Sequence, residues 1–140
     1  MAQPTSRPTS EIGATAELAV ANALTKAGYA VFLPFFNAPS RIDLIFEDPL
    51  RGLRRVQCKF GRFTTDAVTF YTCSHTGGVE RGYAGEVDEF GVYCKGRGLV
   101  YLVPIENVPR RFACLRLGPT KNNQQRGVRW AEPYVLGPPW

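Results

Sequence analysis

The spacing of apolar and polar residues changes several times along the chain, and each change marks an expected element. A polar, proline-bearing start (residues 1–9) is followed by Ser10, a suitable N-cap for a helix over residues 11–27, which Gly28 is suited to end. Runs of β-branched and aromatic residues bounded by Pro and Gly then predict strands. These runs cover residues 29–35, 41–47, 53–60, 68–73 and 99–103.

The remaining segments carry weaker patterns. The start of residues 83–93 is interpreted as a short helix, and residues 114–117 and 128–134 are strand candidates. A helix, several strands, a second helix and further strands are typical of an α+β fold with a mixed sheet. No repeat or linker interrupts the pattern, so we expect a flexible tail over residues 1–9 and a single domain over residues 10–140.

Two neighbouring apolar runs, residues 41–46 and 55–60, carry polar side chains in unusual places. Asp43 interrupts the first run, and Gln57 and Lys59 interrupt the second. A charge within an apolar strand is costly without a partner or a task, and Gln57 and Lys59 share one face because side chains alternate. If the runs pair through the turn-rich segment 48–52, all three groups converge. A carboxylate and an amide oxygen can then hold a divalent cation while the lysine orients a water, which is the layout of a metal-dependent phosphodiesterase site.

Each of these residues also has a structural interpretation. Asp43 is a candidate buried partner of Arg41 or Arg55, and Lys59 a candidate edge-strand charge. Glu17 lies on the apolar stripe of the predicted helix, where it either snorkels or pairs with an arginine. Together with Asp43 and Gln57, a metal-facing or supporting role for Glu17 is favoured.

The composition suggests a polyanionic partner and argues against two kinds of histidine- or cysteine-dependent site. The 140 residues include 17 Lys and Arg and 12 Asp and Glu, giving a net charge of +5 and a pI near 9.2, which suits a polyanion such as DNA. Four cysteines form no CxxC pair and His75 is the only histidine, which argues against a structural zinc site and against HNH-type chemistry. Free cysteines in apolar runs favour a reducing, cytoplasmic location, and we expect neither a signal peptide nor a membrane span.

The order of these residues resembles the PD-(D/E)XK nuclease superfamily. The resemblance rests on Glu17 in the helix, Asp43 in a strand, and the tripeptide Gln57-Cys58-Lys59. Ile42 stands where the superfamily name has proline, and Gln57 replaces the usual acid, which removes one negative charge from the site. The Gln-x-Lys version is similar to the small homing endonucleases encoded in group I introns, as are residues 81–94 and 127–131.

The resemblance implies a restriction-endonuclease-like core, a mixed β-sheet flanked by helices, and Mg²⁺-dependent hydrolysis of double-stranded DNA. Asp43, Gln57 and the Cys58 carbonyl would hold Mg²⁺, which prefers oxygen ligands. Lys59 would position water or stabilise charge on phosphorus. Glu17 completes the catalytic set.

Other polar residues are assigned more simply. Glu86 and Asp88 are interpreted as structural carboxylates, with Arg81 a possible partner, and His75 as a loop residue. Ser74 is a further phosphate-contact candidate or a solvated loop residue. The expected DNA contacts, each with a solvated surface residue as the alternative, are Arg62, Arg81, Lys121 and Arg126.

The sequence thus predicts a metal-dependent endodeoxyribonuclease, with homing endonuclease as the preferred role. Cutting both strands takes two active sites, so a homo-oligomer, dimer or tetramer, is expected. A Holliday-junction resolvase-like nuclease and a non-catalytic DNA-binding module with a degenerate site are the alternatives.

Overall fold

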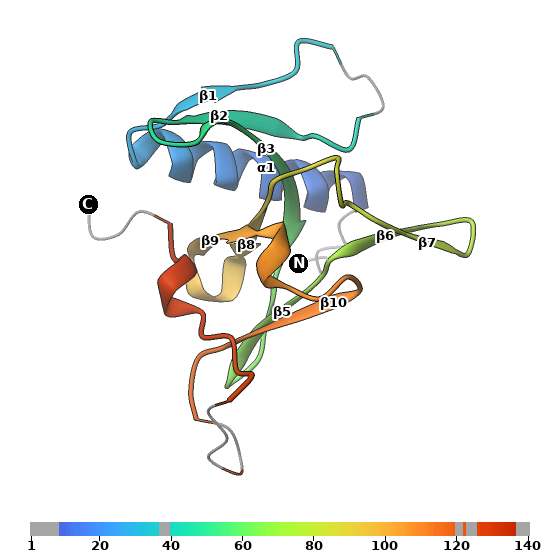
Figure 1. The fold of residues 1–140 in the computed structure, drawn as a ribbon, viewed down its shortest axis with the longest axis vertical. Coiled ribbons are helices and arrows are strands. Elements are labelled where there is room, and N and C mark those ends of the chain that lie inside the picture. The colour runs from blue at the N-terminus through green and yellow to red at the C-terminus, as the bar shows by residue number, and fades with distance from the viewer. Residues whose placement is uncertain (1–8, 37–39, 120–121, 123–125, 137–140) are drawn as a thin grey trace, which may run out of the picture.

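A long helix precedes a series of short strands in the computed structural model, which describes residues 9–36, 40–119, 122 and 126–136 (Figure 1). The helix is α1 (Thr9–Lys26). The strands are β1 (Ala30–Phe32), β2 (Leu44–Asp48), β3 (Gly52–Phe60), β4 (Arg62–Phe63), β5 (Ala67–Tyr71), β6 (Cys73–Thr76), β7 (Val79–Gly82), β8 (Glu89–Cys94), β9 (Leu99–Pro104) and β10 (Phe112–Arg116). Three short 3-10 helices are η1 (Lys95–Arg97), η2 (Ile105–Asn107) and η3 (Glu132–Tyr134).

The main sheet has five strands in the order β1-β2-β3-β8-β9. The β3–β8 pair is parallel, and the other neighbours are antiparallel, so the sheet is mixed, as predicted. Strand β3 is central in this sheet. The ladder with β2 ends at Val56, however, and residues 56–60 pair with β8 alone, so Lys59 lies at a local edge of the sheet and agrees with the edge-strand interpretation as well.

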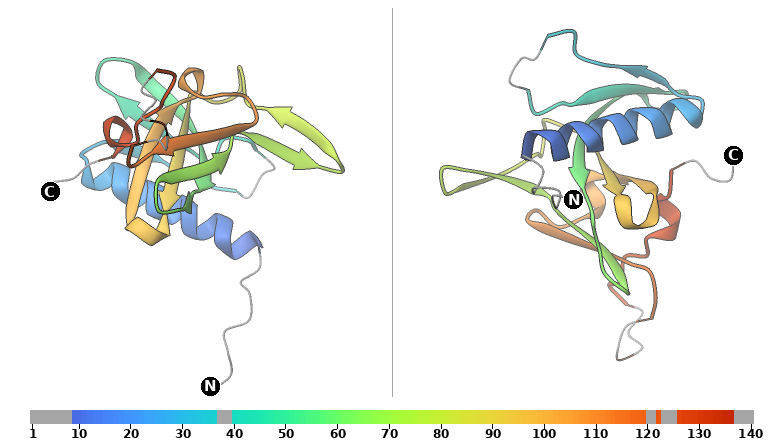
Figure 2. Two further views of the ribbon diagram at one scale, coloured as in Figure 1. Left: turned by 90° about the horizontal axis from the view of Figure 1, so that it is seen from below. Right: turned by 180° about the vertical axis from the view of Figure 1, so that it is seen from behind.

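Helix α1 covers one face of the main sheet (Figure 2, right). Val20 and Leu24 of α1 are fully buried in a core cluster with Phe46 and Val56 of the sheet. Gly91 makes this close packing possible, because a Cβ at that position would lie 2.5 Å from Cγ1 of Val20. The helix is thereby held close above the middle of β3 and β8.

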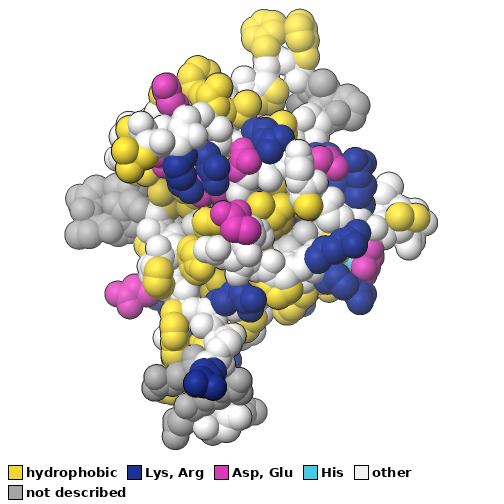
Figure 3. Space-filling view, in the orientation of Figure 1, with side chains coloured by type: hydrophobic (Ala, Val, Ile, Leu, Met, Phe, Trp, Pro, Cys, Tyr) yellow, Lys and Arg dark blue, Asp and Glu magenta, His cyan; other side chains and the backbone are white. Residues whose placement is uncertain are grey.

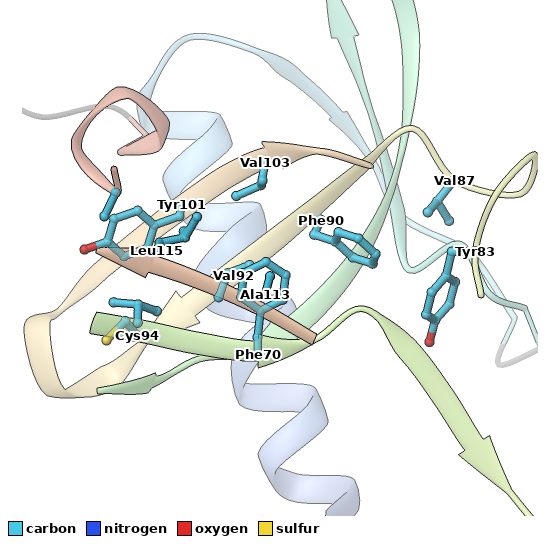
Figure 4. Packing of buried hydrophobic residues seen from close by; sticks show 12 residues of the cluster. Phe70, Tyr83, Val87, Phe90, Val92, Cys94, Tyr101, Val103, Ala113 and Leu115 are labelled. Carbon is cyan, nitrogen blue, oxygen red and sulfur yellow. The ribbon is translucent and has the colours of Figure 1, made fainter. Parts of the chain in front are cut away.

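The opposite face of the main sheet packs against a second sheet of three strands in the order β10-β5-β4. The core between them contains Phe70 of β5, Phe90 of β8 and Leu115 of β10 (Figure 4). Phe70 and Phe90 meet edge to face, with ring centroids 5.8 Å apart. Helix and second sheet thus cover opposite faces, and together with the mixed sheet they make the α+β fold predicted from the sequence.

Some element boundaries differ from the sequence prediction. The helix includes Ser10, so this residue is not the N-cap. The run 29–35 is a strand only over Ala30–Phe32. The run 68–73 divides between β5 and β6 at Thr72, whose N–H and hydroxyl donate to the carbonyls of Arg111 and Pro109.

Two predicted elements are wrong. Residues 83–87 form a turn and not a helix: the N–H groups of Glu86 and Val87 both donate to the Tyr83 carbonyl, and Gly85 has φ +78°. Residues 128–134 form a single bridge at Trp130 followed by η3, and not a strand. In the part of the chain that the structure describes, no helix is long and apolar enough to cross a membrane.

Candidate functional site

The β2–β3 hairpin brings Asp43 beside the segment that carries Gln57 and Lys59, as the sequence predicted. The ladder ends at the Leu44–Val56 pair, and the N–H of the preceding Asp43 donates to the Val56 carbonyl at 2.8 Å. The Asp43 carboxylate then accepts the backbone N–H of Cys58 at 2.7 Å. The carboxylate is therefore fixed beside the Gln57–Lys59 segment.

Asp43 lies in a setting that disfavours its charged form. Burial raises its pKa from 3.8 to about 6, the Cys58 N–H lowers it, the neighbouring Glu17 carboxylate raises it, and Lys59 lowers it. Glu17 thus lies close to Asp43, even though its side chain is on an exposed part of α1. Two carboxylates meet here with insufficient positive charge between them.

The alternative partners of Asp43 are occupied elsewhere. Arg55 binds Asp88 through its Nε and Nη2, each 3.0 Å from a carboxylate oxygen, and through its backbone N–H at 2.9 Å. These bonds hold the pKa of Asp88 down at about 2. Arg41 binds Glu86 at 3.3 Å. The structural interpretation of Asp43 as the partner of either arginine is therefore wrong.

Glu86 and Asp88 have the arginine partners expected of structural carboxylates. The Glu86 carboxylate lies 2.7 Å from Nη2 of Arg81, and Asp88 is the partner of Arg55. Sequence reasoning overlooked Glu89, which is 1% exposed and meets Arg51 and Arg54 at 3.4 and 3.5 Å. Burial raises the pKa of Glu89. None of these three carboxylates shares hydrogen bonds or ion pairs with Asp43 in the described residues.

Lys59 points to Tyr83, a residue that the sequence analysis did not assign to the site. Its Nζ lies 3.1 Å from the Tyr83 hydroxyl oxygen and 4.7 Å from the ring centroid. The Arg41 guanidinium carbon lies 3.8 Å from the centroid of the same ring. Tyr83 is 5% exposed and packs edge to face on Phe90, with centroids 5.7 Å apart (Figure 4). A tyrosine anchored in the core thus fixes the position of the lysine.

Arg41 connects the start of β2 to the β6–β7 segment. Its Nη1 donates to the Gly82 carbonyl at 2.7 Å, and its Nη2 donates to the Ser74 hydroxyl at 3.0 Å and to the Arg81 carbonyl at 3.1 Å. Sequence reasoning considered Arg41 only as a partner of Asp43. These contacts instead make it a link between two hairpins at the site.

A depression of about 440 Å³ opens next to these residues. Its lining includes Gln57, Arg41 and Tyr83, together with Ser74 and Arg81. The Gln57 Nε2 donates to the Cys58 carbonyl at 3.3 Å, so the amide and the predicted carbonyl ligand lie side by side. The depression therefore gives an extended ligand direct access to the Gln57 amide.

Cys58 contributes only its backbone. The side chain is 8% exposed and faces the core cluster under α1, and burial strongly raises the pKa of the thiol. The thiol is therefore protonated at neutral pH. Its N–H holds Asp43 and its carbonyl oxygen lies beside Gln57, which fits the predicted carbonyl role.

The predicted DNA contacts have different surroundings. Arg62 on β4 and Arg126 are exposed. Arg81 is exposed but paired with Glu86. Lys121 lies outside the described residues. Lys and Arg side chains lie among Asp and Glu side chains on the face in Figure 3, so local ion pairs offset part of the basic excess.

Comparison with known proteins supports the fold and shows the family. No curated protein sequence matches the chain significantly. The fold is similar to the solved structure of a bacterial homing endonuclease, I-Ssp6803I, with a TM-score of 0.68 and 22% sequence identity over 92% of this chain and 89% of that one. The family described as PD-(D/E)XK endonuclease matches residues 8–136. The chain therefore belongs to the PD-(D/E)XK endonuclease family.

Proposed function

We propose that the protein is a Mg²⁺-dependent endonuclease that hydrolyses phosphodiester bonds of double-stranded DNA. The observation that carries this proposal is the set of groups around the Asp43 carboxylate. Its carboxylate is held by a backbone N–H and lies close to Glu17, and the two arginines near it in sequence, Arg41 and Arg55, form ion pairs with other carboxylates. A divalent cation would supply the missing charge.

The donor set fits Mg²⁺. Asp43 would bind the ion through a carboxylate oxygen, Gln57 through its amide oxygen and Cys58 through its carbonyl oxygen, and Mg²⁺ prefers such oxygen ligands while keeping several waters. When bound, the ion polarises the phosphate and lowers the pKa of a coordinated water. One carboxylate and two neutral oxygens make a weakly charged set, so Glu17 supports the site with a second negative charge.

Lys59 is the residue that acts on the reacting atoms. Its ammonium group, fixed at 3.1 Å from the Tyr83 hydroxyl, would donate hydrogen bonds to the attacking water or to the phosphate oxygens. Because Lys59 pairs with Val92 of β8 and its ammonium group contacts the buried Tyr83, the group is fixed before substrate arrives. Little reorganisation is then needed in the transition state.

We propose that the DNA backbone enters along the depression beside Gln57 and Arg41. Arg62, Arg81, Lys121 and Arg126 would contact phosphates; Arg81 must exchange Glu86 for a phosphate to do so. Contacts of this kind release counterions, so affinity for a long duplex should fall steeply across a salt series. A flat dependence would contradict this basic surface.

The biological role that we propose is homing endonuclease, acting in the cytoplasm as a dimer or tetramer with one nuclease domain over residues 10–140 in each chain. The similarity in fold to a bacterial homing endonuclease supports this role. A Holliday-junction resolvase-like nuclease is the alternative within the family, and a non-catalytic DNA-binding module is the alternative outside enzymes. Gln57 disfavours the first, and the retained set of Glu17, Asp43 and Lys59 disfavours the second.

A cleavage selection from randomised duplex DNA tests the proposal. The purified protein is incubated with the pool in Mg²⁺, and in Ca²⁺ as a control, and the cut ends are sequenced. We expect Mg²⁺-dependent cuts in both strands at a defined site. A four-way junction is incubated with the protein in parallel. Cleavage of this junction but not of the duplex pool would favour the resolvase alternative, and binding without cleavage of either would favour the non-catalytic module.

A further inference from the structure

The β6–β7 hairpin projects from the body of the molecule as an isolated ribbon (Figure 1). Cys73, Ser74, His75 and Thr76 pair with Gly82, Arg81, Glu80 and Val79, and in the described residues these two strands form a sheet of their own. An isolated two-stranded hairpin is marginally stable in water. A cross-link between its strands would therefore have a large effect on its order.

Three side chains that can bind a metal lie on one face of this hairpin. Cys73 and His75 are two residues apart in β6, so they share a face, and Glu80 pairs directly with His75 across the ladder. This placement also corrects the prediction that His75 is a loop residue. The Cys73 Sγ lies 3.9 Å from the His75 Nε2, which lies 3.3 Å from the Glu80 Oε1, and all three ligand atoms are within 4.8 Å of one another.

These separations are close to those of a tetrahedral zinc site. Zinc–sulfur and zinc–nitrogen bonds of about 2.3 and 2.0 Å at a tetrahedral angle place sulfur and nitrogen about 3.5 Å apart, and nitrogen and oxygen ligands about 3.3 Å apart. The observed 3.9 and 3.3 Å are within a few tenths of an ångström of these values, and the Cys73 sulfur and the Glu80 carboxylate oxygen lie within 4.8 Å of each other, so the exposed glutamate must move toward the sulfur when the ion binds. A thiolate, an imidazole and a carboxylate also balance the charge of a divalent ion.

The burial of the three groups suits an ion that enters from solvent. Cys73 is 2% exposed and fixed at the base of the hairpin, where its Sγ lies 3.6 Å from the Arg111 carbonyl. His75 and Glu80 are 49% and 37% exposed at their side chains, which leaves the fourth position open to water. A thiolate ligand selects zinc over Mg²⁺, so this site is chemically separate from the one at Asp43.

Arg111 competes for the same carboxylate. Its Nη2 and Nε lie 2.7 and 3.1 Å from the Glu80 Oε1, and this ion pair lowers the pKa of Glu80. The Arg111 side chain is 74% exposed, so it can turn into solvent when a divalent ion arrives. The pair thus keeps Glu80 ionised and in place without blocking the site.

Against the expectation from the sequence that there is no structural zinc site, we propose that Cys73, His75 and Glu80 bind one zinc ion that braces the β6–β7 hairpin. The opposite face of the hairpin carries Ser74 and Arg81, which line the depression beside Gln57 and bind Arg41 and Glu86. Bracing one face therefore orders the wall of the depression on the other. The inference rests on the hairpin geometry alone and holds whether or not the protein cuts DNA.

Metal titration of the reduced, chelator-stripped full chain tests this site. Zn²⁺ is titrated in a calorimeter with excess Mg²⁺ present to occupy oxygen-only sites, and Co²⁺ is used in parallel because a thiolate–cobalt bond absorbs in the near ultraviolet. We expect one Zn²⁺ per chain and the cobalt–thiolate band. Absence of saturable Zn²⁺ binding, or binding without the band, would overturn the proposal.

Variants assign the ligands. His75→Ala and Glu80→Gln change exposed side chains and should each weaken Zn²⁺ binding at least about ten-fold. Cys73→Ser should remove the cobalt band, whereas Cys114→Ser, the matched control on β10, should keep it. A band that survives in Cys73→Ser or vanishes in Cys114→Ser would overturn the assignment of Cys73.

Arg111→Gln should change the Zn²⁺ affinity in the direction opposite to the ligand variants. Loss of the competing ion pair should tighten Zn²⁺ binding by up to about fivefold. Binding that tightens within this range or stays the same agrees with Glu80 as a ligand, and weaker binding would overturn that assignment. Zn²⁺ should also slow amide hydrogen exchange in Cys73–Gly82 of the wild type but not of His75→Ala, and equal exchange with and without Zn²⁺ would overturn the bracing role.

Discussion

Asp43 and Asp88 are two aspartates in contact with the same strand, β3, yet their surroundings shift their pKa values in opposite directions. Asp88 receives three hydrogen bonds from Arg55, and its pKa falls to about 2. Asp43 receives one backbone N–H and sits near Glu17, and its pKa rises to about 6. A carboxylate that already has its cation stabilises the fold, whereas one left without it is available for an external cation.

The largest expected effect follows from removing the Asp43 charge. Asp43→Asn keeps an oxygen to accept the Cys58 N–H but leaves the cation only neutral ligands and Glu17. We expect Mg²⁺-dependent cleavage to fall on the order of 10³-fold or more. Single-turnover cleavage of a selected site measures this, with Asp88→Asn as the matched control at less than about tenfold loss. Normal cleavage by Asp43→Asn at the usual Mg²⁺ concentration would mean that the metal site lies elsewhere.

Removing Lys59 should have the next largest effect. Lys59→Ala is expected to lower the cleavage rate about 10²–10³-fold, because one donor to the developing charge is lost. DNA affinity in Ca²⁺ and the unfolding temperature should change little. Wild-type turnover by Lys59→Ala would exclude the proposed role.

The two aspartates also predict how the rate depends on pH. At limiting Mg²⁺, Asp43 must lose its proton before it binds the ion, so the rate should fall about tenfold per pH unit below about pH 6. Asp88 contributes nothing in this range, because its pKa is about 2. A rate that stays level down to pH 4.5 would contradict the raised pKa of Asp43.

Gln57→Glu should increase the difference between Asp43 and Asp88, because it adds a second negative charge beside Asp43 and none beside Asp88. Metal affinity is expected to hold or to rise by up to about one order of magnitude, because affinity follows the charge of the ligand set. Turnover falls if the new carboxylate forms an ion pair with Lys59. Calorimetric Mg²⁺ titration of the variant measures the first effect and single-turnover kinetics the second. A large loss of metal affinity would contradict the assignment of residue 57 as a metal ligand.

The smallest effects concern stability, and they differ in sign. Ionised Asp43 opposes folding above pH 6, so at pH 7 Asp43→Asn should raise the free energy of unfolding by about 1–2 kcal/mol after allowance for solvent. This gain should decline as pH falls below about 6 and disappear below about pH 4, where the carboxyl is protonated in both the folded and the unfolded chain. Asp88→Asn should instead lower the unfolding temperature by a few degrees, and that loss should vanish as pH falls from about 4 to 2. Thermal unfolding at several pH values measures the stability change of each variant. A change of the same sign in Asp43→Asn and Asp88→Asn would contradict the proposed difference between the two aspartates.

The hairpin that carries the site was predictable from local sequence. The turn at residues 48–52 and the two-residue period in Gln57 and Lys59 define the register that brings Asp43 to Cys58. The pattern also identified the charges in the strands as unusual. Such features depend on neighbouring residues, and sequence displays them directly.

The rest of the site depends on contacts between distant segments. Tyr83 reaches Lys59 only because β3 and β8 pair in parallel and the chain turns at residues 83–87. The ion pairs of Arg41 with Glu86 and of Arg55 with Asp88 depend on the same arrangement of strands. His75 and Glu80 meet across a hairpin whose strands have little hydrophobic pattern, so neither the strand nor the cluster could be predicted from spacing.

The central claim is that Asp43, and not Asp88, holds the catalytic cation, and counting bound Mn²⁺ tests it most directly. Mn²⁺ has the oxygen-ligand preference of Mg²⁺, and the electron paramagnetic resonance signal of free Mn²⁺ gives the bound fraction without any DNA. We expect Asp88→Asn to bind Mn²⁺ like the wild type and Asp43→Asn to bind it at least about tenfold more weakly. Equal binding by wild type and Asp43→Asn, or an equal loss in both variants, would contradict the account.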